Sequence, residues 1–136
     1  ALDPLLAPAL AELISAAVET EARCVRAAPE GDKPHIIEGD LFVANTEGAS
    51  EVAYPAIRPA GDRATVDVDL MYVDERFAKG DRRRAVAWRD RLDLVRTNGR
   101  WVVQDVRLRR TQSLAASLGG YIARAAAVCK PKEAKG

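Results

Sequence analysis

The sequence predicts an α+β domain with a long amphipathic helix at each end and a twisted antiparallel sheet between them. Three observations predict this class. Apolar residues recur at helical spacing before residue 27 and again after residue 113. Between residues 52 and 108, apolar and polar residues alternate as they do in strands. An Asn98-Gly99 pair lies inside that region, and this dipeptide favours the turn of a β-hairpin.

Length and composition favour one globular domain. The chain has 136 residues, 48% hydrophobic and 30% charged, which is typical of a folded domain and not of a disordered one. We therefore expect a single domain over residues 1–136, with a frayed tail from Lys130 to Gly136. No apolar run reaches the roughly 18 residues that cross a bilayer, because Glu12 and Glu19 interrupt the first helix. The chain starts without Met or a basic-then-apolar leader, which fits a processed export precursor or a trimmed chain.

Each predicted helix has a start signal and an apolar face. The first begins with Asp3 as N-cap and Pro4 as first helical residue, and Ser113 caps the last. The inward face of the first helix carries Leu6, Leu10, Leu13, Ala17 and Cys24. That of the last carries Leu114, Leu118, Tyr121, Ile122, Ala125 and Cys129.

The two cysteines lie at the far ends of these faces. If the helices pack with those ends adjacent, a Cys24–Cys129 disulfide closes a loop of about a hundred residues, worth about 4 to 5 kcal/mol in the chain-entropy model. Two unrelated buried thiols are the alternative. A disulfide favours an oxidising compartment, so we expect a periplasmic or secreted protein.

The sheet is expected to begin with an edge strand at Val52–Arg58, because Pro55 cannot donate a ladder hydrogen bond. A strand at Arg63–Val73 follows, with Val66, Val68, Leu70 and Tyr72 on one face. The apolar residues Ile36, Ile37, Leu41 and Phe42 in the preceding connection are expected to cover an open edge or end of the core.

The hairpin joins Arg84–Arg96 to Trp101–Leu108 through the Asn98-Gly99 turn. A two-residue loop pairs Thr97 with Arg100, and counting back predicts the pairs Leu94–Val103, Leu92–Asp105, Asp90–Arg107 and Trp88–Arg109. We expect the core on the face that carries Val86, Trp88, Asp90, Leu92, Leu94, Trp101, Val103, Asp105 and Arg107.

Short motifs along the chain resemble a family of exported bacterial proteins similar to the nuclear transport factor 2-like superfamily. These motifs are Ile37-Glu38-Gly39-Asp40-Leu41-Phe42, Glu47-Gly48, Trp88-Arg89-Asp90, the run Gly99 to Val106, and Ser113-Leu114. The resemblance implies a cone-like fold, in which the N-terminal helix lies across a strongly curved sheet with a pocket between them. It also implies a homodimer. The added C-terminal helix departs from the minimal pattern of the superfamily.

Asp90 and Asp105 are the weak catalytic candidates. Carboxylates among apolar side chains can act as acids or bases, as in pocket isomerases and lyases of the superfamily. In the structural alternative, Asp90 forms an ion pair with Arg107, and Asp105 accepts hydrogen bonds from the backbone or a tyrosine. His35 has no cysteine or carboxylate at ligand spacing, and no phosphate loop or nucleophile motif is present, so we expect no metal and no cofactor.

Charge is unevenly distributed along the chain. The stretch from Arg76 to Arg110 holds 12 of the 21 basic residues but 4 of the 20 acidic ones. A basic sheet surface can bind an acidic protein, or it can be a solvated face with no partner. The candidate binding residues are Arg82, Arg83, Arg84, Trp88, Arg89 and Arg91.

These features favour an exported, non-enzymatic protein that binds another protein, with an inhibitor or immunity-type role by analogy of fold. Nucleic acid is not an expected partner of an exported protein. A pocket isomerase or lyase and a carrier of a small apolar ligand are the alternatives.

Overall fold

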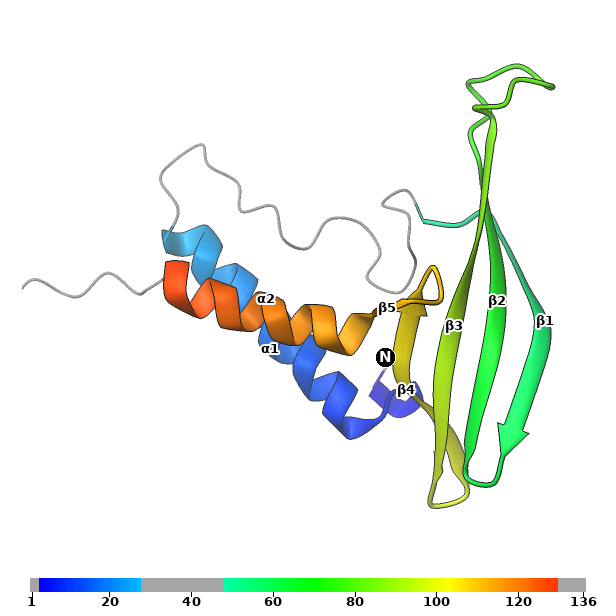
Figure 1. The fold of residues 1–136 in the computed structure, drawn as a ribbon. Helices are drawn as coiled ribbons and strands as arrows, with labels where there is room; N and C mark the ends of the chain where they lie inside the picture. Colours follow the sequence, from blue (N-terminus) through cyan, green and yellow to red (C-terminus); the bar gives the residue numbers. More distant parts are fainter. Residues whose placement is uncertain (1–2, 28–47, 130–136) are drawn as a thin grey trace, which may run out of the picture.

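A computed structural model describes residues 3–27 and 48–129, and it has the predicted α+β class. A curved sheet of antiparallel strands, in the order β1-β2-β3-β4-β5, does not close into a barrel, and the N-terminal and C-terminal helices lie side by side next to β4 and β5 (Figure 1). The elements are η1 Asp3–Leu5, α1 Pro8–Ala27, β1 Glu51–Ala60, β2 Arg63–Val73, β3 Ala85–Thr97, β4 Arg100–Leu108, β5 Gln112–Ser113 and α2 Leu114–Val128. The expectations for His35, for the apolar residues 36–42 and for the tail 130–136 lie outside the described residues.

The start of the first helix differs from the prediction. Residues 3–5 form a 3₁₀ turn, and the α-helix begins at Pro8 instead of Pro4. A helix running from Pro4 would place Pro8 in its interior, where proline lacks the N–H and collides with the preceding turn, whereas the first helical position tolerates it. The segment between is anchored to the sheet, since Leu6 bridges Val103 and the Ala7 N–H donates to the Val103 carbonyl at 2.8 Å.

The predicted hairpin turn is confirmed, but the predicted pairing of its two strands is correct only near the turn. Asn98 and Gly99 have positive φ angles of 54° and 75°, and the pairing of Thr97 with Arg100 continues as far as Leu94 with Val103. A bulge then adds one residue to β4, so that Leu92 pairs with Val106 instead of Asp105. The predicted Asp90–Arg107 and Trp88–Arg109 pairs are also wrong. Counting from a tight turn cannot detect a bulge, because nothing in the turn reports the extra residue.

The bulge decides which side chains of β4 reach the core. Val106 is almost fully buried there, and Arg107 instead forms an ion pair with Asp93, with 2.8 Å between Arg107 Nε and Asp93 Oδ2. Trp88 and Asp90 are buried on the face predicted to be the core side. That face is not buried along its whole length, because Val86 and Trp101 near its two ends are exposed.

Edge strand β1 carries two prolines. Its register against β2 shifts between Ala53 and Ala56, so Pro55 lies at an irregularity of an edge strand, where a missing N–H is tolerated. Strand β2 has the predicted bounds, Arg63–Val73.

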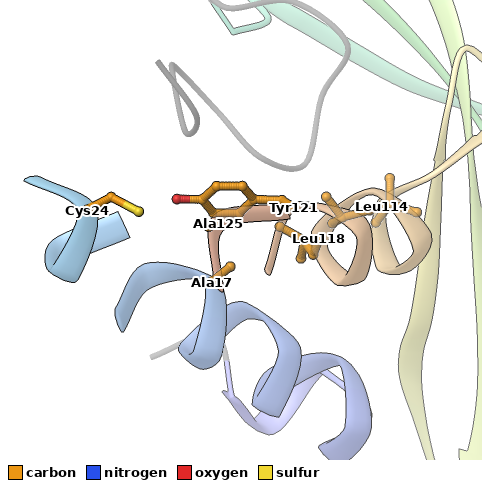
Figure 2. Close-up of a cluster of buried hydrophobic side chains, with 7 residues drawn as sticks. Ala17, Cys24, Leu114, Leu118, Tyr121 and Ala125 are labelled. Atoms are coloured by element: carbon orange, nitrogen blue, oxygen red, sulfur yellow. The ribbon is translucent and has the colours of Figure 1, made fainter. Parts of the chain in front are cut away.

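The core has two parts. One lies between the two helices and β4, with Ala17, Cys24, Val106, Leu114, Leu118, Tyr121 and Ala125 (Figure 2). The other lies on β2 and β3, with Val66, Val68, Leu70 and Trp88. The inward faces predicted for the helices are thus largely confirmed. Ser113 caps α2 as predicted, its hydroxyl accepting a hydrogen bond from the Ala116 N–H.

The predicted disulfide is present. Cys24 and Cys129 are bonded with their Cα atoms 5.0 Å apart, 105 positions apart in the sequence. The bond joins the C-terminal end of α1 to the residue that follows α2. In the described parts of the chain, no helix is long and apolar enough to cross a membrane.

Candidate binding surface

The most exposed large apolar side chains of the sheet lie on edge strand β1. Val52, Tyr54 and Ile57, here called the apolar row, are 49%, 62% and 65% exposed. Val52 pairs with Leu70 and Ile57 with Val66, and directly opposed residues of antiparallel strands share a face. Val52 and Ile57 therefore extend the apolar face of β2 and β3 to the edge of the sheet, and Tyr54 lies between them at the register shift.

A groove of about 480 Å³ lies beside the start of the row. Val52, Leu70, Met71 and Trp88 line it together with Glu51, Asp69 and two alanines. A second groove, of about 420 Å³, lies toward the other end of β1 and β2 and is lined by Arg58, Arg63, Thr65 and Asp93 among others. Glu51, Ala53, Asp69, Met71 and Ala87 alternate with Val52, Leu70 and Trp88 along their strands, so most side chains at the first groove point to the face of the sheet opposite the apolar row.

The basic loop, residues 74–84, joins β2 to β3 and extends beyond the end of the sheet opposite the hairpin turn (Figure 1). Two aspartates of the loop each accept hydrogen bonds from the arginine two residues later. Asp74 accepts hydrogen bonds from the backbone N–H and the guanidinium of Arg76, and Asp81 does so from Arg83. The Asp74 N–H closes the base of the loop by donating to the Arg84 carbonyl at 2.6 Å. The loop is therefore held by its own side chains.

The predicted binding residues of this loop differ in what they contact. Arg84 donates to the Phe77 carbonyl at 2.6 Å, and Arg83 pairs with Asp81 and lies 4.5 Å from the centre of the Phe77 ring. Arg82 and Lys79 are exposed and have no carboxylate partner among the described residues. The loop thus presents cations on an ordered backbone, which limits the entropy lost when a partner binds.

Arg89 and Arg91, two further predicted binding residues, face the sheet's own carboxylates. Asp67 is only 2% exposed and lies near three guanidinium groups, with contacts of 2.9 Å to Arg58, 3.3 Å to Arg91 and 3.8 Å to Arg89. Arg89 also bonds Asp69 at 2.6 Å. These arginines are largely neutralised within the sheet and offer a partner less charge than their number suggests. The register between β2 and β3 brings these arginines next to Asp67 and Asp69. Because an eleven-residue loop joins the two strands, their register cannot be counted from the sequence as it can from a two-residue turn.

Trp88 and Asp90 form a buried pair. Asp90 is 2% exposed and accepts a hydrogen bond from the Arg109 backbone N–H at 2.7 Å and a longer one from Trp88 Nε1 at 3.3 Å. Trp88 is therefore part of the core and not an exposed anchor for a partner. Asp90 holds the chain where it turns after β4.

Asp105 organises the start of α2. It accepts hydrogen bonds from the backbone N–H groups of Val106 and Ala115, both at 2.9 Å, and from the Ser113 hydroxyl. The expectation that Asp105 accepts backbone hydrogen bonds is confirmed. Because it satisfies donors at a helix N-terminus, where a negative charge is favourable, its position has a structural explanation.

No group of three or more His, Cys, Asp and Glu side chains that could hold a metal ion occurs within residues 3–27 and 48–129. One buried polar atom there, the Tyr121 hydroxyl, has no hydrogen-bond partner. Burial, with a smaller contribution from Glu21, raises the pKa of Tyr121. Its ring packs between the helices, on the side of Cys24 (Figure 2).

The arginine–aspartate pairs predict an acid-sensitive stability. The hydrogen bond from Arg58 lowers the pKa of Asp67 against the opposing effect of burial, Arg89 lowers the pKa of Asp69, and Arg76 lowers that of Asp74 to about 2. An unfolded aspartate titrates near about pH 3.9, so the unfolded chain takes up protons first as the pH falls. Their stabilisation is complete above about pH 5 and is lost as the pH falls from about 4 through the lowered folded-state values.

Urea unfolding at a series of pH values tests this expectation. The free energy of unfolding should fall between about pH 4 and pH 2, and the fall should be shallower in the variant Asp67→Asn/Asp69→Asn, which lacks two of the titrating groups. If the free energy of unfolding falls equally steeply with pH in the wild type and the variant, these ion pairs do not determine the acid sensitivity.

No family model, no curated protein and no solved structure matches the chain. The resemblance to the nuclear transport factor 2-like superfamily therefore stays a prediction.

Proposed function

We propose that this chain is an exported, non-enzymatic binding module whose partner is another protein, and that the partner contacts the apolar row of β1. The observation that carries the proposal is the exposure of Val52, Tyr54 and Ile57 on one edge strand of the sheet. Exposed apolar surface of this kind is typical of protein-binding sites, and aromatic side chains such as Tyr54 are enriched there.

The roles of the two candidate acids support a binding function over catalysis. Asp90 and Asp105 both accept hydrogen bonds from backbone N–H groups that they position. A general acid or base needs a proton-accepting atom within reach of a substrate, and these oxygens are engaged by the fold. Neither residue lines the two grooves described above.

Export is proposed from the disulfide. A bond between Cys24 and Cys129 forms and persists in oxidising compartments such as the periplasm. An inhibitor or immunity-type role is the finer form of the proposal, and it predicts that the bound partner loses an activity.

Site-specific photocrosslinking tests the proposal. The aromatic crosslinker p-benzoylphenylalanine replaces Tyr54 in the full chain, which is then expressed in its source cells and irradiated. We expect a discrete crosslinked protein from position 54. The same crosslinker at Trp101, an exposed aromatic beside the hairpin turn at the other end of the sheet, is the matched control and should give little of this product. Crosslinking only to small molecules, or equal crosslinking from both positions, would contradict a protein-binding row.

A further inference from the structure

We propose that the partner presents an acidic peptide segment with at least one large apolar side chain, and that this segment spans the basic loop and the adjacent end of the apolar face. This inference rests on the proposed function and specifies the chemistry of its partner. It is carried by the position of the basic loop next to the exposed valines Val52 and Val86.

The sheet register brings the two kinds of surface together. Val86 follows Arg84 by two residues and pairs with Tyr72, while Val52 pairs with Leu70, two residues earlier on the same face of β2. The Val73 N–H donates to Ser50 Oγ at 3.1 Å, which fixes the start of β1 beside the end of β2. Val52, Val86 and the basic loop therefore lie at one end of the sheet.

The charge of the loop favours an acidic segment. Residues 74–84 contain five basic and three acidic residues. Two of the acids, Asp74 and Asp81, already pair with Arg76 and Arg83, while Lys79 and Arg82 are exposed without a carboxylate partner in the described chain. Carboxylates placed above the loop would form charge-assisted hydrogen bonds with these cations.

Charge fixes the orientation of the segment. Glu51, the residue before Val52, is exposed at the start of β1. A carboxylate of the partner would be repelled by Glu51 and attracted by Lys79 and Arg82. We therefore place the apolar side chain of the segment against Val52 and Val86, and its acidic residues over the loop.

Side-chain recognition is favoured over addition of a strand to β1. A peptide that extends a sheet needs a continuous row of N–H and C=O groups on the edge strand. Pro55 and Pro59 have no N–H, and the register of β1 is interrupted beside Pro55. Prolines and bulges on an edge strand are features that block such pairing.

A nucleic acid would need a longer cationic surface than this one. Proteins that bind duplexes commonly neutralise about six to ten phosphates. Here Arg58, Arg89 and Arg91 are paired with Asp67 and Asp69, as are Arg96 with Asp62 and Arg107 with Asp93. Other exposed arginines without a carboxylate partner in the described chain, such as Arg63 and Arg110, lie away from the loop, so Lys79 and Arg82 suit a short acidic segment and not a long polyanion.

Selection from a phage-displayed library of random short peptides tests the inference, with the full disulfide-bonded chain as bait. Recovered peptides should be enriched in Asp and Glu and contain a large apolar residue. A synthetic copy should bind at least about tenfold more weakly to the variant Lys79→Glu/Arg82→Glu and to Val52→Ser/Val86→Ser. The matched control Arg63→Glu/Arg110→Glu reverses two exposed arginines away from the loop and should change the affinity less than about twofold.

Three results would overturn the inference: recovered peptides that are neutral or basic, no recovered peptides, or loop variants that bind as the wild type does. Tighter binding of duplex DNA or of anionic lipid vesicles than of any peptide would overturn it too. If a protein is crosslinked from position 54 but the selected peptides are not acidic, the proposed protein-binding function stands and only the inference of an acidic segment fails. Absence of any crosslinked protein would remove both.

Discussion

Replacing Cys24 and Cys129 together by serine is expected to lower the free energy of unfolding by about 4 to 5 kcal/mol, because the bond closes a loop across 105 positions of the chain. In the chain-entropy model the loss appears in the unfolded state, which becomes free to explore more conformations. Urea unfolding followed by circular dichroism measures it, as a lower midpoint with a nearly unchanged slope.

The control for this prediction is the wild type in reductant, which should unfold at the midpoint of the double-serine variant. The effect should also be visible locally, because the last turns of both helices are joined at this bond and α1 and α2 pack mainly on each other and on β4. Amide exchange at the C-terminal ends of the two helices should therefore accelerate most. A loss below about 1 kcal/mol would show that packing alone holds these ends together.

Replacing Asp105 by alanine is expected to have the second largest effect, a loss of about 2 to 4 kcal/mol. The substitution leaves the N–H groups of Val106 and Ala115 and the Ser113 hydroxyl without their common acceptor. Ser113 is also the N-cap of α2, so the start of that helix loses its anchor to the sheet. Thermal and urea unfolding of the purified variant measure the loss.

Asparagine at position 105 provides the graded comparison. It keeps one acceptor oxygen but loses the negative charge at the helix N-terminus, so Asp105→Asn should be destabilised by less than Asp105→Ala. Binding of the partner should be the same in both variants under conditions where both are folded. A stable Asp105→Ala variant that has lost a measurable activity would instead favour the catalytic interpretation of this residue.

Several elements follow from the sequence because their signals are local. The Asn98-Gly99 turn needs two residues with positive φ, and the apolar faces of the helices need only helical spacing. The disulfide could be predicted because both cysteines lie at the ends of those faces. The start of α1 was misplaced because two prolines compete for the first helical position, and contacts of Leu6 and Ala7 with β4 select the second.

The candidate binding surface is harder to predict from the sequence than the secondary structure. Counting charges marked Arg89 and Arg91 as binding residues, but Asp67 and Asp69 face them only through the β2–β3 register. The bulge in β4 likewise exchanged Asp105 for Val106 opposite Leu92. Val52 and Ile57 looked like ordinary members of an edge strand, and their exposure depends on what the rest of the chain covers. Such features depend on contacts between distant segments, which periodicity does not report.

The affinity of the protein crosslinked from position 54 tests the central claim most directly. Titration calorimetry would compare the wild type with Val52→Ser/Ile57→Ser and with Val18→Ser/Val25→Ser, whose valines on α1 are similarly exposed at 52% and 56%. We expect the β1 variant to bind at least about tenfold more weakly and the α1 variant to match the wild type within about twofold. Equal affinities for all three proteins would contradict a partner bound on the apolar row.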